Sequence, residues 1–494
     1  MIRTTLLWML VAFLAAYSWR DWYKALCGLI LLMAVVQHPD FPKSVMGVQG
    51  VNPWNILLFV IFFAWLASRG REGLKWDVPS KFRNLLIVYL LIVVISFIRL
   101  LFDLGPLEQH AALSNTEPPS VLILFSEHMV NCLKWVVPGF LLYDGCRSEQ
   151  RFRLATYCVL AVYVLLAVQV IRWMPLSTLT SGSDLEGRSM KILLNEIGYH
   201  RVNMAMLLAG GSWALFCART VPNSKFLFNM ALFFSALVFL GMALTGGRMG
   251  FATWAAIAVV FGAFKWKKIM ILAPVGLALI ITFVPAVQER MLQGFTEESI
   301  DTNVSIESLA YDDSDGPHLY TVTSGRTFAW SFVIDEIAKA PWFGHGREGM
   351  KRTGLALFLY AEYGESFPHP HNAYLEWMLD NGIISLIPVL LFYWFVVKMA
   401  VKLFRDQGDR YSVAIGGITL SLVLALLIAA MGSQTFYPRE GAVGMWSAIG
   451  LALRVYVQKQ YLDRERRKSG DAAAARSYWG LQDNRMPYQQ YRYG

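Results

Sequence analysis

The chain has 494 residues, of which 56% are hydrophobic and only 16% are charged, and its mean hydropathy is +0.43. Soluble domains carry about 25% charged residues, so this composition excludes a soluble enzyme, a coiled coil and a disordered chain. The formal charge of +9 fits basic cytoplasmic loops, and we expect no nucleic-acid partner. The apolar residues come in blocks of about 16–22 residues. Because lipid admits only helices or closed barrels, the sequence predicts an all-α polytopic membrane protein.

Thirteen apolar segments are candidate membrane spans, and the first two are so short that we expect about twelve spans in total. In chain order the segments are 4–18, 24–38, 53–69, 83–102, 122–143, 153–174, 201–219, 226–245, 250–265, 268–285, 380–404, 411–432 and 442–458. One large hydrophilic loop, 286–379, interrupts them, and such loops are usually functional. The predicted parts are N-terminal transmembrane helices (1–285), this loop with short helices (286–379), C-terminal transmembrane helices (380–458) and a basic, disordered tail (459–494).

The distribution of Lys and Arg predicts the orientation of the chain. Basic residues concentrate at 69–83, 147–153, 265–268, 402–410 and 459–468. The positive-inside rule places these segments in the cytoplasm. The loop 286–379 then faces outward and the C-terminus lies inside, while the side of the N-terminus depends on whether the span count is 11, 12 or 13.

Three ionisable residues fall inside one apolar segment, 122–143, namely Glu127, His128 and Lys134. Charges at membrane depth are functional hypotheses by default. An interaction between Glu127 and Lys134, two helical turns apart, would neutralise both and is the structural alternative.

The sharpest polar motif is residues 369–377 (HPHNAYLEW), which Asn381 and Gly382 follow closely. Pro370 favours a helix start, so we expect a short amphipathic helix that has His371 in its first turn and ends at Asn381 and Gly382. The positive end of the helix dipole would keep the imidazole neutral and able to accept a proton. A turn-capping histidine at the interface is the alternative.

A tight outward turn at residues 245–250 (TGGRMG) separates two long apolar segments. Its glycines let the backbone turn closely. Arg248 sits at membrane depth, where its planar fork suits a phosphate or pyrophosphate. The alternative is that Arg248 reaches toward lipid headgroups.

Other outward cations are Arg188, Lys191, His200, Arg201 and Arg326. Arg201 begins an apolar segment, and Arg326 opens an expected helix through Ile337 for which a structural role is the alternative. The pattern Asp313-Ser314-Asp315 is one that metal-dependent glycosyltransferases use, but a solvated loop explains it better. The five cysteines lie in or beside apolar segments, and no spacing predicts a metal site.

Together these segments resemble the O-antigen ligase / O-antigen polymerase superfamily of bacterial membrane glycosyltransferases. Residues 243–250 (ALTGGRMG) are similar to its T-G-S-R-G turn, with Gly247 in place of the usual Ser. Residues 326–346 are similar to its R-x-x-x-W and P-x-x-G-x-G stretch, with His345 at a position where small or aliphatic residues are commoner. Residues 371–382 are similar to its H-N-x-Y-L-E and x-G pattern. The similarity covers about 240–390.

The resemblance implies a GT-C-like fold in the bacterial inner membrane with an active site facing the periplasm. It also implies transfer of a glycan from undecaprenyl pyrophosphate to lipid A core or to a second lipid-linked glycan, without metal or cofactor. The positions that match the family's functional residues are Arg248 and His371, which we expect to be catalytic. Arg201, Arg326, Asn372, Arg188 and Tyr374 are expected to bind substrate.

Two alternatives stay open in the sequence. A ligase and a polymerase share this architecture, because acceptor choice depends on loop shape. A transporter or flippase of lipid-linked sugars belongs to another class and predicts charged residues along a path through several spans. The unusual polar residues gather near one outer face instead, which favours an enzyme.

Overall fold

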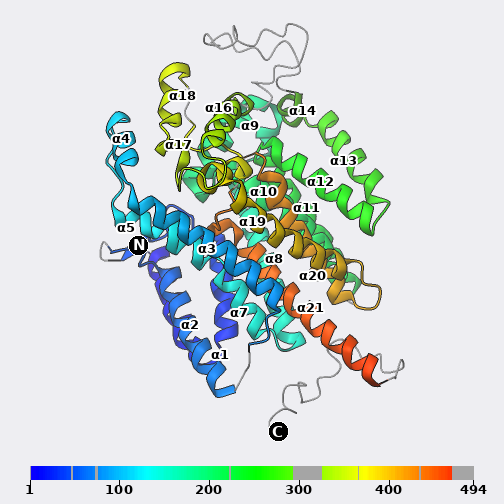
Figure 1. Ribbon diagram of the computed structural model, residues 1–494. Coiled ribbons are helices and arrows are strands. Elements are labelled where there is room, and N and C mark those ends of the chain that lie inside the picture. Colours follow the sequence, from blue (N-terminus) through cyan, green and yellow to red (C-terminus); the bar gives the residue numbers. More distant parts are fainter. Residues whose placement is uncertain are drawn as a thin grey trace.

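The computed structural model describes residues 2–45, 48–72, 76–221, 224–292, 325–364, 367–432 and 435–469, and these are almost entirely helical (Figure 1). A short antiparallel hairpin of β1 (Ser44–Val45) and β2 (Val48–Gln49) pairs Ser44 with Gln49. Seven stretches in the described residues are long and apolar enough to cross a membrane. They are α2 (Pro53–Glu72), α3 (Ser80–Phe102), Val121–Gly145, α8 (Glu149–Trp173), α11 (Lys225–Leu244), α19 (Ala373–Phe404) and α20 (Arg410–Ala429).

An eighth span is possible where α13 (Ile269–Phe283) and α14 (Pro285–Leu292) join at a bend of 103°. Helix α12 (Arg248–Phe264) is apolar but has 17 residues, about 26 Å at 1.5 Å per residue, which is short of the ~30 Å of a hydrocarbon core. The described helices thus confirm a multi-pass α-helical membrane protein, while a total of about twelve spans stays a prediction.

The span Val121–Gly145 contains α5 (Val121–Leu124), α6 (Asn131–Lys134) and α7 (Val137–Gly145). The other described helices are α1 (Ile2–Leu31), α4 (Gly105–Leu113), α9 (Gly182–Ile192), α10 (Arg201–Ala218), α16 (Arg326–Lys339), α17 (Gly349–Arg352), α18 (Leu355–Tyr363) and α21 (Val443–Ser469). The expected spans 4–18 and 24–38 largely form one helix, α1, with a kink at Asp21. Helix α21 continues to Ser469, so the predicted disordered tail does not begin at 459.

Helix α10 is the centre of the bundle, and almost all of its residues are buried. Two glycines allow this position. A Cβ at Gly210 would lie 2.8 Å from the Cβ of Ala425 on α20, and a Cβ at Gly211 would lie 2.6 Å from the ring of Tyr163 on α8. Small residues let helix backbones approach closely in a membrane, where packing rather than hydrophobicity drives association. The N-terminal end of α10 is thereby fixed beside α9 and α12.

Helix α19 is broken at Gly382, which has φ 77° and ψ 169°. The expected short helix is therefore the first part of a membrane-spanning helix, and only a sharp change of direction separates the two. The loop at 341–346 fills the break: the N–H groups of His345 and Gly346 donate to the carbonyls of Leu379 and Asp380, each at 2.8 Å. Carbonyls freed by a helix break need such partners when they are buried.

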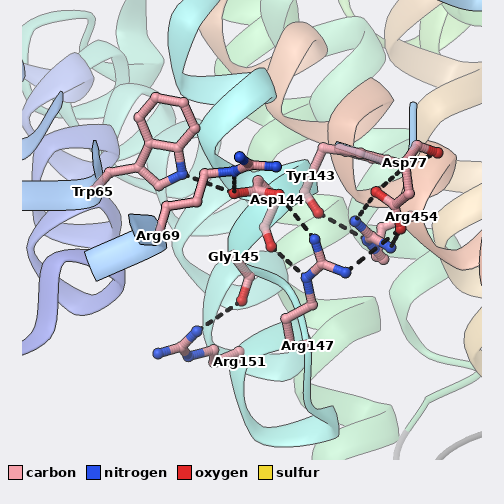
Figure 2. A network of polar contacts seen from close by, with 9 residues as sticks. All are labelled: Trp65, Arg69, Asp77, Tyr143, Asp144, Gly145, Arg147, Arg151 and Arg454. Atoms are coloured by element: carbon pink, nitrogen blue, oxygen red, sulfur yellow. Dashed lines mark hydrogen bonds and ion pairs between the residues drawn. The ribbon is translucent and has the colours of Figure 1, made fainter. Parts of the chain in front are cut away.

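A buried polar network joins α2, α7 and α21 at the end of the bundle opposite α9, α14 and α16 (Figures 1 and 2). Asp144 is fully buried and accepts hydrogen bonds from Arg69 at 3.0 Å and Arg147 at 2.8 Å. Arg454 of α21 forms a two-pronged pair with Asp77 at 2.8 and 3.0 Å. Each buried charge has an opposite partner, which is the condition for tolerating it inside a protein.

The structure of the segment 121–145 does not show the suggested interaction between Glu127 and Lys134. A π-helical turn at Phe125–Val130 changes the helical register between them. Glu127 is exposed, while the Lys134 ammonium lies 4.3 Å from the centre of the Trp135 ring. An exposed carboxylate needs no internal counter-ion, and the aromatic face stabilises the cation. His128 is the buried residue of the three.

Candidate active site

Three of the predicted cations, Arg201, Arg248 and Arg326, are each the first residue of a helix, α10, α12 and α16. Their charges act on one another, since burial and the charges of Arg248 and Arg201 lower the pKa of Arg326. A guanidinium stays protonated despite such a shift. The chain therefore concentrates positive charge at one partly buried place, which is costly unless an anion is present.

The turn at 245–250 holds Arg248 against α10. Gly246 adopts φ 63°, a left-handed conformation that glycine favours. A Cβ at Gly247 would lie 2.9 Å from the Cβ of Ala205. This contact explains why the chain departs from the family pattern: a serine at 247 has no room against Ala205.

A fourth arginine and a carboxylate, both missed by the sequence analysis, complete the group. Arg201 Nη2 lies 2.6 Å from Glu186 Oε1, and Arg290 Nη1 pairs with Glu186 Oε2. Glu186 belongs to α9 and Arg290 to α14, and these two helices contact each other. The acidic residue lies 104 positions from Arg290 along the chain, so no local pattern indicates the pair.

His371 lies beside this group but not in the first turn of a helix, as the sequence suggested. Asn372 is the N-cap of α19, so His371 precedes the helix, and its φ is 52°. Asn372 attracts the helix start because its side-chain oxygen accepts the N–H groups of Tyr374 at 3.0 Å and Leu375 at 3.3 Å. The carbonyl of Pro370 accepts a hydrogen bond from Trp330 of α16 at 2.9 Å, which ties the histidine segment to the helix of Arg326.

The environment of His371 keeps its ring neutral. Burial, followed by the charges of His369, Arg326 and His200, lowers the pKa of His371 to about 3. Burial also lowers the pKa of His369 and of His200. The predicted neutral imidazole therefore results from desolvation and from neighbouring cationic groups, and not from a place in the first turn of a helix.

Three residues expected to bind substrate make contacts with backbone groups. Asn372 caps α19, Tyr374 donates its hydroxyl to the carbonyl of Leu427 at 2.9 Å, and Arg188 donates to the carbonyl of Trp173 at 3.3 and 3.4 Å. Each of these contacts has a structural role. Substrate binding by these three residues stays a prediction.

His345 is held more firmly than its two flanking glycines suggest. Its Nε2 lies 2.9 Å from the carbonyl of Glu336 near the end of α16, and its own N–H bonds to α19. Gly344 and Gly346 supply positive φ angles of 61° and 92° on either side. His345 therefore joins α16 to α19.

A second polar cluster, also missed from the sequence, lies behind this loop. Buried Arg347 contacts Asp380 at 3.2 Å and His128 at 3.2 Å, and Tyr437 donates to Asp380 at 2.9 Å. Glu348 lies 3.6 Å from His128. These contacts connect the segment 121–145, residues 347–348 and α19 into one unit.

A small pocket opens beside the start of α10. Its lining includes Tyr199, Asn203, Tyr437, Arg439 and Glu440, together with apolar side chains. Tyr199 and Asn203 flank Arg201 in sequence, but Arg201 itself does not line the cavity. The charge of Arg439 also acts on His369.

Within the described ranges, no group of three His, Cys, Asp or Glu side chains is arranged to hold a metal ion. Asp313 and Asp315 lie outside the described residues.

Comparison with known proteins gives one match, a family model described as O-antigen ligase, which matches residues 233–390. The matched range contains Arg248, Arg326 and His371, and it ends before α20. A search of curated proteins finds no match. The chain's resemblance to the O-antigen ligase / O-antigen polymerase superfamily is thus confirmed over residues 233–390.

Proposed function

We propose that this protein is a membrane glycosyltransferase that moves a glycan from undecaprenyl pyrophosphate to an acceptor hydroxyl. The observation that carries the proposal is the convergence of Arg201, Arg248 and Arg326 beside a neutral, buried His371. A lipid-linked glycan is the class of substrate that the matched family implies. A diphosphate is the leaving group that such an arrangement of cations would stabilise.

In the proposed reaction, the acceptor oxygen forms a bond to the anomeric carbon while the bond from that carbon to the diphosphate breaks. His371 accepts the proton of the acceptor hydroxyl as general base. Arg248, with Arg201 and Arg326, holds the diphosphate as its negative charge develops. Direct attack from the opposite side inverts the anomeric centre. These roles need no metal or cofactor.

We further propose a GT-C-like protein in the bacterial inner membrane whose loop 286–379 and active site face the periplasm. The basic segments near the opposite end of the bundle support this orientation. Alkaline phosphatase and fluorescent-protein fusions at 310 and 470 test it. Phosphatase activity at 310 and fluorescence at 470 are expected, and phosphatase activity at 470 would reverse the orientation.

The acceptor is proposed to be lipid A core or a second lipid-linked glycan, and the cavity beside Asn203 and Glu440 is the place we assign to it. The polysaccharide profile of a deletion strain separates the possibilities. Loss of glycan attached to lipid A core indicates a ligase, and accumulation of single repeats indicates a polymerase. Loss of both, with intact cytoplasmic precursor, would instead indicate a flippase.

A further inference from the structure

The carboxylate of Glu186 lies between two arginines in the way that a phosphate would. One carboxylate oxygen contacts Arg201 at 2.6 Å, and the other contacts Arg290. Arginines bind phosphate in the same way, with different oxygens of one anion accepting hydrogen bonds from different guanidinium groups. Arg248 lies near enough for the charge of Glu186 to act on it as well.

Arg201 keeps room for another anion oxygen. The charge of Glu186 acts on Arg248 and Arg290, and the charges of Arg201 and Arg248 act on Arg290 and Arg326. One terminal nitrogen of Arg201, Nη1, is buried without a hydrogen-bond partner among the described residues. An anion with more oxygens than a carboxylate could occupy this nitrogen as well.

Glu186 is also better placed to leave than its partners. Its side chain is 29% exposed, while those of Arg201 and Arg290 are 14% and 7% exposed. Helix α9 lies over the turn of Arg248, because a Cβ at Gly246 would meet Leu185 at 3.1 Å. A movement of α9 or of the Glu186 side chain toward solvent would uncover the arginines without moving them.

We propose that Glu186 is a resting counter-ion that occupies the place of the donor's diphosphate, and that Arg290 receives the diphosphate when Glu186 leaves. This inference rests on the proposed function. A carboxylate that stayed between the arginines would repel a diphosphate bound to the same groups. Displacement removes that repulsion and lets two phosphate groups satisfy the four cations.

The test measures the Kd of undecaprenyl pyrophosphate for purified protein in phosphatidylcholine nanodiscs. Glu186→Gln keeps the shape of the side chain and removes the competing charge, so Kd is expected to fall about fivefold or more. Arg290→Gln is expected to raise Kd. In the double variant, Glu186→Gln is expected to lower Kd by a smaller factor than it does in the otherwise wild-type protein, because both residues act on the same anion site.

Glu289→Gln is the matched control. It removes one negative charge from the same contact of α9 with α14, but Glu289 accepts from the backbone N–H of Gly182 at 2.5 Å instead of from an arginine. Its Kd is expected to match that of the wild type. The Tm of each variant is measured by thermal unfolding. A variant whose Tm equals that of the wild type has kept its fold, so a change in its Kd reports on binding.

The outcomes separate this inference from the proposed function. If the wild type does not bind undecaprenyl pyrophosphate, the proposed function fails and the inference fails with it. If the wild type binds but Glu186→Gln binds equally or more weakly, the donor site stands and Glu186 is a fixed positioning residue. Phosphatidylglycerol is added to the nanodiscs as a comparison. If Glu186→Gln lowers the Kd of phosphatidylglycerol by the same factor, the site binds lipid headgroups, and the assignment to a diphosphate is overturned.

Discussion

The rings of His369 and His371 lie 4.1 Å apart, centre to centre, and are tilted by 54°. Pro370 separates the two residues, and the N–H of His371 donates to Nδ1 of His369 at 3.3 Å. Two imidazoles at this distance disfavour each other's protonation. The pair therefore holds a proton acceptor in its unprotonated form next to several arginines.

The first prediction concerns which histidine is the base. His371→Ala should lower the rate of transfer in purified enzyme by about 10²–10⁴-fold, the usual loss for a general base. His369→Ala and His345→Ala are the controls and should retain most activity. Donor binding should survive in His371→Ala, because the arginines hold the diphosphate. Equal activity in the three variants would remove His371 from the mechanism.

The second prediction is the pH dependence of transfer. With the pKa of His371 at about 3 in the free protein, the ring is already neutral at pH 5, and kcat/KM, which reports the free enzyme, should stay flat between pH 8 and pH 5. An ordinary histidine with pKa ~6.5 would lose about 30-fold over this range. Between pH 3 and pH 6.5 the unfolded chain binds the proton that the folded chain does not, so this histidine adds stability that is lost as the pH falls. A rate that titrates near pH 6.5 contradicts the prediction.

The third prediction tests the geometry of Arg248. Arg248→Lys keeps the charge but loses the planar fork, so transfer should fall strongly while membrane abundance stays normal. Arg219→Lys at the other end of α10 is the control, since Arg219 lies against Phe216 and Trp266. A near wild-type rate for Arg248→Lys would favour contact with lipid headgroups.

The fourth prediction uses the departure from the family pattern. Gly247→Ser restores the usual residue but places its Cβ against Ala205, so the turn must shift and transfer should fall by about 10²-fold, as for small misplacements of catalytic groups. Adding Ala205→Gly removes the blocking methyl group and should restore most of the rate. Steady-state kinetics of the single and double variants decide this. If Ala205→Gly does not restore the rate, the contact with Ala205 is not the reason why position 247 is a glycine.

The fifth prediction concerns stability at the opposite end. Asp144→Ala leaves Arg69 without its buried counter-ion, while Arg147 keeps Asp77 at 3.5 Å, and the loss should cost about 3–5 kcal/mol. Asp335→Ala, on the exposed face of α16, should change the stability little. Thermal unfolding in detergent measures both. An unchanged Tm for Asp144→Ala would show that water replaces the carboxylate.

Hydropathy predicted the helical class and the seven spans found in the described residues, because apolar length is a local property of the sequence. It could not show that α1 continues through Asp21, or that Phe125–Val130 forms a π-helical turn that separates Glu127 from Lys134. Both depend on which helices pack alongside. The start of α16 at Arg326 was predicted correctly, because glycine and an apolar run mark it locally.

The sequence singles out Arg248 and His371 because one short segment carries each signal, and their roles stay predictions. Glu186 and Arg290 were missed because their partners are distant in sequence and come together only through the contact of α9 with α14. The first turn of α19 was misplaced by two residues. The side chain of Asn372 caps the helix, and this outweighs the preference of Pro370 for a helix start.

The break at Gly382 has a consequence for the behaviour of the protein in different membranes. Helices that are too long or too short for a bilayer tilt within it. A Cβ at Gly382 would come within 2.1 Å of the carbonyl of Trp342, so the outer loop is seated directly on the pivot. Tilting of residues 383–404 can then occur below this pivot while His371 keeps its distance from the arginines. Transfer rates should accordingly depend little on the acyl-chain length of the host lipid.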